Sequence, residues 1–462
     1  MEQSGKIRCS CAYGNIIIFE TMMEIVLSVC YFLLGVFLIG RSNFFKIAGI
    51  PVSVFRGLFV IKVCAAILLF IIYTRFYTER EKADIFRYYD DSALIFNTLP
   101  GDPAAFFSMM TGIGGEAPHL TVRYDAMRNW YNSDMVFNDS RTMIRISALL
   151  RILTFNTYFP QAVIFCFLAF TGLTGLFRVL NHHLPGKSLL LMLLVFLLPS
   201  TLIWTSGLIK EAFLMFAMGL FFYHFHQALS LRRLSLQRGC FLLFAAGVLV
   251  IIKAYVFFLI VPLLISWWLF SSSRSMVSLK VSVLFIAYFL LLTVCSFLLT
   301  GHEVPTLLSE KQSEFYAVAQ RDNARSVVEI PRLTDEWQSL ILAAPGAFLR
   351  TLAYPHPGQA HNLLMWFSVM ENLLLAVVIV FLLYSLRRRT IVATTPFIVA
   401  TFLFASSLFI LAGWVVPVIG ALVRYRVPAL PFILLPLVYW SPAHLDFEDF
   451  SGRYLSKVKP AP

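Results

Sequence analysis

Long apolar stretches dominate the sequence and constrain what the chain can fold into. A helix of about 20 apolar residues crosses the roughly 30 Å hydrocarbon core of a bilayer. Such stretches lie at about 15–40, 57–75, 157–177, 188–204, 212–228, 281–300, 362–386, 391–413 and 425–440. Hydrophobic residues make up 59% of the chain and charged residues 13%, which excludes a soluble enzyme, a disordered protein and a nucleic-acid-binding domain. The sequence predicts an all-α fold, a polytopic transmembrane helical bundle.

A further apolar stretch at 240–270 is too long for one ordinary span, and Lys253 and Tyr255 interrupt it. A charged side chain at membrane depth is costly. We therefore expect two short helices that meet at Lys253. With this hairpin, the chain has about eleven spans.

Basic residues in the short loops indicate how the chain is oriented, because such loops face the cytoplasm. Arg178, Arg232 and the run 387–389 all fall on one side when 240–270 is a hairpin, together with the basic C-terminal tail. The N-terminus is then outside and the C-terminus cytoplasmic. The same rule explains the net charge of +12, so we expect no nucleic-acid partner. We predict a single membrane domain over 1–462, with two long outer segments at 76–156 and 301–361.

The first outer segment opens with a group of ionisable and aromatic side chains. Asp84, Arg87, Tyr88, Asp90 and Asp91 follow the second apolar stretch closely. Carboxylates at the membrane surface are suited to act as a general base on a hydroxyl group. An aromatic interface belt with solvated charges is equally consistent with this pattern.

A second polar group lies between the stretches at 188–204 and 212–228. Gly207 permits a tight turn, and Lys210 and Glu211 stand where the next helix begins. Backbone N–H groups and the helix dipole attract an anion at such a position. The alternative is a Lys–Glu pair that only caps the turn.

A third group precedes the last apolar stretch. Arg424, Tyr425 and Arg426 are followed by Pro428, which favours a helix that begins near that residue. Two guanidinium groups beside a helix N-terminus are typical of a phosphate site. These arginines and Lys253 lie on the outer side, so the orientation rule does not account for them.

These motifs resemble the GT-C superfamily of polytopic glycosyltransferases, which use polyprenyl-phosphate-linked sugars. The segment 84–88 (Asp-Ile-Phe-Arg-Tyr) looks like the Asp-Glu-x-Arg-Tyr motif of the aminoarabinose and protein mannosyltransferase branches. The segments 199–211 and 424–428 are similar to those of uncharacterised bacterial envelope proteins of this type. Two departures are Ile85, where relatives often have a second acid, and the apolar stretch 15–40, an extra helix before the catalytic loop.

The resemblance implies a GT-C-like fold in the bacterial inner membrane, with the site on the periplasmic side. Asp84 would deprotonate an acceptor hydroxyl as it attacks the anomeric carbon. Charge then develops on the leaving polyprenyl phosphate. Four cations would bind that phosphate: Arg424, Arg426, Lys210 and Lys253.

The resemblance also suggests supporting roles and partners. The residues expected to orient groups or contact substrate are Arg87, Tyr88, Glu211 and Tyr425. Because Ile85 replaces an acid, Asp90 or Asp91 is an alternative catalytic residue, and a divalent cation is left open as the one candidate cofactor. The expected partners are a polyprenyl-phosphate-linked sugar, a glycan or lipid acceptor and membrane lipids. The segment 301–361, with a helix near 307–320, would cover the donor or acceptor groove.

Two other functions fit parts of the sequence. An O-antigen-type polymerase or ligase would use residues of the second outer segment: Arg350, His356 and His361. A lipid or solute transporter would have charges buried within spans, and Lys62, Lys253 and Glu371 are candidates. We expect Glu371 and Asn372 to make polar contacts between helices. A structural subunit is the remaining possibility.

Overall fold

The computed structural model describes residues 2–76, 80, 83–114, 117–130, 137–273, 275–386, 394–442 and 447, excluding the side chains of 2–20 and Asp84. Within these ranges the chain is helical and contains no β-strand. Eight helices are long and apolar enough to cross a membrane, or nine when one bent pair is counted as a single span. The predicted all-helical, polytopic membrane protein is therefore confirmed.

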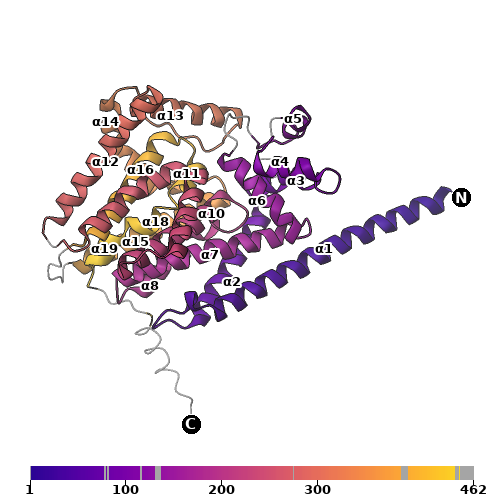
Figure 1. Cartoon of the computed structure of the whole chain (residues 1–462), viewed down its shortest axis with the longest axis horizontal. Coiled ribbons are helices and arrows are strands. Elements are labelled where there is room, and N and C mark those ends of the chain that lie inside the picture. Colours follow the sequence, from indigo (N-terminus) through magenta and orange to yellow (C-terminus); the bar gives the residue numbers. More distant parts are fainter. Residues whose placement is uncertain are drawn as a thin grey trace, which may run out of the picture. The chain divides into compact units, whose positions relative to one another are not determined.

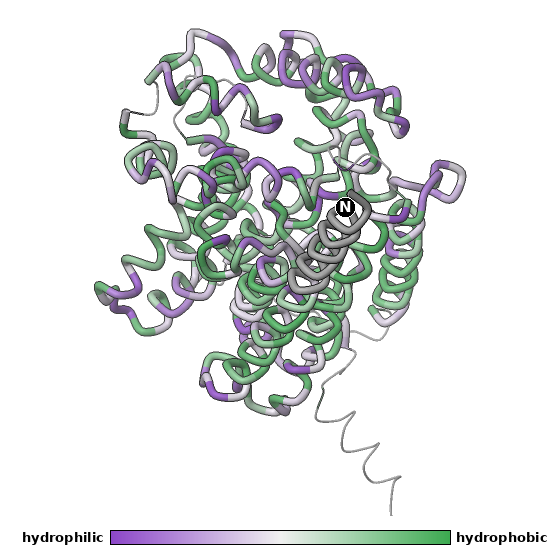
Figure 2. The backbone as a smooth tube through the Cα atoms, turned by 90° about the vertical axis from the view of Figure 1, so that its right-hand side faces the viewer, coloured by the Kyte–Doolittle hydropathy of each residue, from purple (hydrophilic) through white to green (hydrophobic). Residues whose placement is uncertain are grey.

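The membrane-span candidates agree closely with the apolar stretches of the sequence (Figure 1). They are α1 (Glu2–Arg41, its span Thr21–Arg41), α2 (Val52–Arg75), α7 (Tyr158–His183), α10 (Lys210–Leu231), α11 (Leu236–Phe270), α12 (Val277–Thr300), α15 (Leu363–Ser385) and α16 (Pro396–Val415). Figure 2 shows long runs of hydrophobic residues along many of the helices, with hydrophilic residues in turns and in some of the other helices.

Two expected spans are interrupted, and proline explains both interruptions. The stretch 188–204 divides into α8 (Ser188–Met192), the π-helical turn η3 (Leu193–Leu197) and α9 (Pro199–Trp204). Leu198, which lies between η3 and α9, is extended, with φ −60° and ψ 127°. The reason is that the helical region is disfavoured for a residue that precedes proline, here Pro199.

The second interruption concerns the expected single span 425–440. The structure has α17 (Ile419–Tyr425), α18 (Leu430–Ile433) and α19 (Leu435–Trp440), and the chain bends by 66° between α17 and the later pair. Pro428, Pro431 and Pro436 in this region remove backbone donors that a continuous helix needs. A helix begins at Leu430 rather than near Pro428, so Arg424 lies in the last turn of α17 and not beside a helix N-terminus.

Helix α11 turns back on itself at Lys253, as the sequence predicts. Lys253 has non-helical angles of φ −152° and ψ 81°. Phe241 stacks on His224, and Trp267 stacks on His226, with ring centroids 4.6 Å and 5.6 Å apart. An unbroken helix would separate Phe241 from Trp267 by about 39 Å, whereas here both contact neighbouring positions of α10. The two arms of α11 therefore form a hairpin with Lys253 at its tip.

The chain divides into two compact units, where the sequence predicts one domain. Unit 1 comprises Met1–Thr174 and Thr205–Phe216, and unit 2 comprises Gly175–Trp204 and Ala217–Pro462.

Unit 1 contains the first outer segment, whose described residues include four α-helices. These are α3 (Asp84–Phe96), α4 (Pro103–Thr111), α5 (Pro118–Asp125) and α6 (Asp139–Leu153), and α3 packs against α6. Side chains define where two of them begin, because Asp102 accepts from the N–H of Ala105 and Asn138 from that of Arg141.

Unit 2 is built around α16, which contacts α11, α12, α13 (Val304–Arg321), α14 (Trp337–Ala353) and the helices α17–α19. Gly413 of α16 permits a close approach to α14, since a Cβ there would lie 2.2 Å from the carbonyl oxygen of Ala347. Thr351 adds a hydrogen bond across the same interface to the carbonyl of Phe409, at 2.7 Å. The helix expected near 307–320 is confirmed as α13.

Candidate functional site

The three carboxylates of the first outer segment lie on α3, in unit 1. Asp84 opens the helix, but its side chain lies outside the described residues. Asp90 accepts two hydrogen bonds from Arg80, at 2.9 and 2.8 Å, and both side chains are about half exposed. That contact also raises the pKa of the Arg80 guanidinium. Asp90 is thus accessible but paired.

Asp91 is buried and fastens α3 to the loop before α6. Its carboxylate accepts from the backbone N–H groups of Arg128, at 3.2 Å, and Asn129, at 2.7 Å. Burial raises the pKa of Asp91, while these hydrogen bonds oppose the shift. Arg87 contacts the same loop through its Nε, 2.8 Å from Oδ1 of Asn129. Asp91 and Arg87 therefore hold one loop from two positions on α3.

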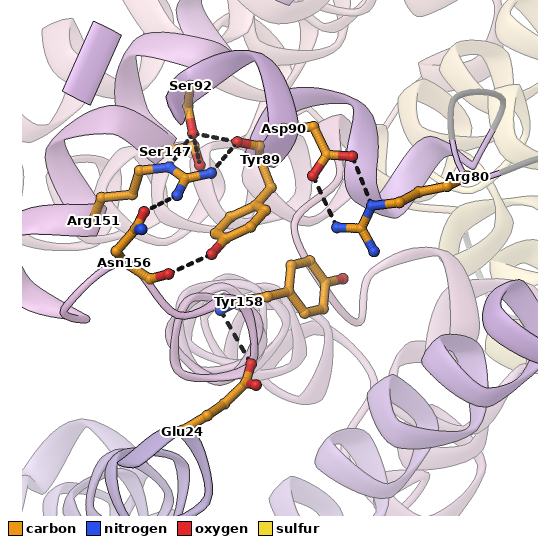
Figure 3. A network of polar contacts seen from close by, with 9 residues as sticks. All are labelled: Glu24, Arg80, Tyr89, Asp90, Ser92, Ser147, Arg151, Asn156 and Tyr158. Atoms are coloured by element: carbon orange, nitrogen blue, oxygen red, sulfur yellow. Dashed lines mark hydrogen bonds and ion pairs between the residues drawn. The ribbon is translucent and has the colours of Figure 1, made fainter. Parts of the chain in front are cut away.

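A polar network connects Tyr89 and Ser92 of α3 with α6 and the start of α7 (Figure 3). Arg151 of α6 donates to Oγ of Ser92, at 2.7 Å, and to the carbonyl of Tyr89. The Tyr89 hydroxyl donates to the carbonyl of Asn156 at 2.6 Å. Glu24 of α1 accepts from the N–H groups at the beginning of α7, where a carboxylate is favoured by the helix dipole. These contacts fix α3 and its acidic residues in unit 1.

Lys210 has a partner that the sequence analysis missed. Its Nζ lies 2.6 Å from Oδ2 of Asp139 and 3.0 Å from Oγ of Ser140, at the start of α6. The same Nζ lies 5.4 Å from the ring centroid of Tyr88. Gly207 adopts φ 120°, which confirms the tight turn that precedes α10. Glu211 is buried.

The Lys210 contacts bring two sequence-predicted residues, Lys210 and Tyr88, to one place in unit 1. Asp139 had no local signal, because it is 71 residues away along the chain and sits in a polar stretch. The pair is partly exposed, with 17% of the lysine side chain and 43% of the aspartate side chain accessible. A charged pair that reaches solvent beside an aromatic ring is suited to bind a polar ligand.

A cation–aromatic cluster lies in unit 2, at the tip of the α11 hairpin. The Nζ of Lys253 is 4.3 Å from the ring centroid of Tyr425, and the rings of Tyr425 and Tyr255 stack 5.8 Å apart. Phe315 of α13 packs edge-on against Tyr425 at 5.8 Å. Lys253 and Tyr425, which are distant in sequence, are therefore neighbours, as a shared site requires.

Arg424 extends this cluster from the last turn of α17. Its Cζ lies 5.2 Å from the ring centroid of Trp204, and the residue is about half-buried. It stands directly before the 66° bend between α17 and the later helices. Broken membrane helices of this kind often surround ligand sites, because the helix ends and the unwound backbone at the break can contact a ligand.

Arg426 is in a different environment from Arg424. Its side chain is fully buried, and Nη2 lies 2.7 Å from Oε1 of Glu371. Its Nη1 donates to the carbonyls of Thr351, at 3.1 Å, and Tyr354, at 3.0 Å. These contacts favour a role for Arg426 in holding the helices together, whereas Arg424 is only partly buried.

The polar contacts expected at Glu371 and Asn372 are confirmed. Glu371 accepts from the backbone N–H of Ser200 at 2.5 Å and from its hydroxyl at 2.7 Å, which joins α15 to α9. Asn372 donates to the carbonyls of Ala353 and Pro355, both at 2.9 Å.

The predicted site residues therefore form two groups. Unit 1 holds Asp84, Arg87, Tyr88, Asp90, Asp91, Lys210 and Glu211, and unit 2 holds Lys253, Arg424, Tyr425 and Arg426. Within the described parts of the chain, no three His, Cys, Asp or Glu side chains are grouped so that they could hold a metal ion. No protein family, curated protein or solved structure matches this chain.

Proposed function

We propose that the chain is a membrane glycosyltransferase with a GT-C-like fold and about eleven spans. It moves a sugar from a polyprenyl-phosphate donor to an envelope glycan or lipid on the periplasmic side of a bacterial inner membrane. Its N-terminus is outside and its C-terminus cytoplasmic. The eleven spans comprise the eight long helices, with α11 counted twice, the interrupted stretch 188–204 and the bent pair.

The observation that carries the proposal is the cation–aromatic cluster around Tyr425. Lys253 and Arg424 come from separate helices and lie against aromatic rings at a helix break. Cations beside aromatic rings at such a break are suited to bind an anionic headgroup through charge-assisted hydrogen bonds. A polyprenyl phosphate supplies such an anion together with an apolar chain that remains in the lipid.

The proposed base is Asp84, on α3. Asp90 is bound by Arg80, and Asp91 is bound by backbone N–H groups, so both have positioning contacts. Asp84 takes the proton of the acceptor hydroxyl, the new bond forms at the anomeric carbon, and polyprenyl phosphate leaves. Fixed cations stabilise the charge on that phosphate, and removing one such group typically lowers the rate by about two to three orders of magnitude.

Mass spectrometry of envelope glycans and polyprenyl-linked sugars tests the proposal in cells that lack the protein. The cells are complemented with wild type, Asp84→Asn, Arg424→Ala or the control Arg321→Ala, each checked for membrane abundance. We expect deletion to remove one sugar and only wild type and the control to restore it. Restoration by both site variants would refute the proposed site, and loss of a long polymer with its repeat unit retained would favour the polymerase.

A transporter is the second candidate, because the described residues include buried charges inside spans. Lys62 of α2 is buried and its Nζ contacts the hydroxyls of Thr205 and Ser206, and Glu371 pairs with Arg426. An unchanged sugar profile in the deletion strain would favour this function.

A further inference from the structure

A cleft in unit 2 lies beside the second half of α13 and the segment that follows it. Its volume is about 790 Å³, within the range of roughly 300–1,000 Å³ typical of small-ligand sites. The polar side chains that line it are Tyr316, Gln320, Asn323, Arg325, Glu329 and Arg332.

These side chains are planar and carry hydrogen-bonding groups of both kinds. Amides offer a donor beside an acceptor, guanidinium groups offer paired donors and a carboxylate offers paired acceptors. Neighbouring hydroxyls of a sugar ring match such pairs, because each hydroxyl both donates and accepts. The lining is thus suited to a saccharide rather than to an apolar ligand.

Two observations show that the hydrogen-bonding groups of the cleft are accessible and that one of them is fixed in position. Arg325 and Glu329 are exposed, and neither side chain makes a hydrogen bond or ion pair with another described residue. Arg332 is held in place, since its Cζ lies 3.6 Å from the ring centroid of Tyr316. The Tyr316 hydroxyl in turn accepts from the N–H of Ile330 at 3.2 Å.

The cleft is joined to the cation–aromatic cluster by backbone and ring contacts. The segment 326–328 pairs with 417–419, through Ile419 N–H to Ser326 and Val328 N–H to Pro417, at 3.0 and 2.8 Å. Residue 419 begins α17, whose last turn carries Arg424, about 7.5 Å farther along the helix axis. Phe315, next to Tyr316, contacts Tyr425.

We propose that this cleft binds the glycan acceptor, with Arg325 and Arg332 donating hydrogen bonds to sugar hydroxyls and the Glu329 carboxylate accepting them. The inference rests on the proposed transferase function, because it places an acceptor on a segment that is hydrogen-bonded to the start of α17, the helix that carries Arg424. It also explains why the second outer segment is polar and folded onto α16 and α17.

Direct binding to the full-length protein in lipid nanodiscs tests the cleft. The probe is the glycan released by mild acid from the envelope of cells that lack the protein, labelled with a fluorophore at its reducing end. Fluorescence anisotropy gives the Kd for wild type, Arg325→Ala, Glu329→Gln and the control Arg321→Ala. Arg321 is an exposed arginine at the end of α13 that pairs with Asp322 and does not line the cleft.

We expect each cleft variant to raise the Kd at least about tenfold, as the loss of a hydrogen bond to a charged group does, and the control to leave it unchanged. Failure of wild type to bind, or equal Kd values for all variants, would overturn the inference. The sugar profile of the deletion strain is a separate readout. If the cleft variants weaken glycan binding but the sugar profile of the deletion strain is unchanged, the cleft is a glycan site and the transferase function is refuted. If the profile loses a sugar but the cleft variants bind as wild type does, the transferase function stands and the cleft proposal is refuted.

Discussion

Arg426 and Glu371 form an ion pair in which both side chains are fully buried, with Nη2 and Oε1 2.7 Å apart. Two residues earlier, Arg424 is half-buried against Trp204. Two arginines of one sequence motif, separated by Tyr425, therefore differ in their contacts: Arg426 joins α15 to the bent helix pair, and Arg424 packs on Trp204 and is partly exposed.

Glu371→Ala is expected to destabilise the protein strongly, because it leaves the Arg426 guanidinium buried without its carboxylate. Breaking a buried pair in this way costs about 3–5 kcal/mol. Unfolding by SDS in mixed micelles measures the change. Asp322→Ala is the control, since it breaks an exposed pair with Arg321 that contributes about 0–1 kcal/mol. Equal effects of the two substitutions would contradict this account of Glu371.

Cysteine labelling tests the hairpin of α11. In a cysteine-free background, Gln237→Cys and Ser272→Cys are both expected to resist a membrane-impermeant maleimide in intact cells and to react after permeabilisation. Glu303→Cys, on the expected outer side, is expected to react in intact cells. A single long span would place residues 237 and 272 on opposite sides, so labelling of only one of them would refute the hairpin.

The pKa of Asp91 predicts a pH dependence of stability. Burial raises this pKa, so the folded state holds the proton more tightly than the unfolded state does. Protonated Asp91 therefore stabilises the folded state. This contribution to the free energy of unfolding is fully present below the unfolded pKa of about 3.9 and is lost as the pH rises through the folded pKa. Thermal unfolding of wild type and Asp91→Asn at pH 4, 5.5 and 7 should show wild type losing Tm relative to the variant as pH rises. A difference in Tm between wild type and Asp91→Asn that stays constant, or grows in favour of wild type, as the pH rises would contradict this.

The Lys210–Asp139 pair predicts opposite effects of two substitutions on anion binding. Lys210→Ala removes a cation and should weaken binding of undecaprenyl phosphate to protein in nanodiscs. Asp139→Asn removes the competing carboxylate and should strengthen it by up to about fivefold, since a partly exposed pair contributes about 0.2–1 kcal/mol. If both variants weaken binding equally, the pair acts only as a structural contact.

The helices and the hairpin could be predicted because their signals are local. Hydropathy alone locates α2, α10, α12 and α15 to within a few residues, and the cost of a buried lysine correctly predicts the break at Lys253. The divisions of 188–204 and 425–440 were missed, although Pro199 and Pro428 were visible in the sequence, because hydropathy averages over such positions.

The partners of the charged side chains could not be predicted, because they depend on how distant helices pack. Asp139 and Lys210 are 71 residues apart, and Glu371 and Arg426 are 55 apart. Arg424 and Arg426 look equivalent in sequence, and only packing distinguishes them. The cleft was missed for the same reason, since its residues are unremarkable until the segment 326–328 pairs with 417–419.

Donor turnover by purified protein tests the central claim most directly. Polyprenyl-linked sugars extracted from the deletion strain are incubated with the protein in nanodiscs and the glycan of the same cells, with and without EDTA, and released polyprenyl phosphate is measured. We predict release by wild type and by Arg321→Ala that requires the glycan, and rates at least about a hundredfold lower for Asp84→Asn and Arg424→Ala. Release at the wild-type rate by both variants, or none by wild type with or without EDTA, would contradict the account.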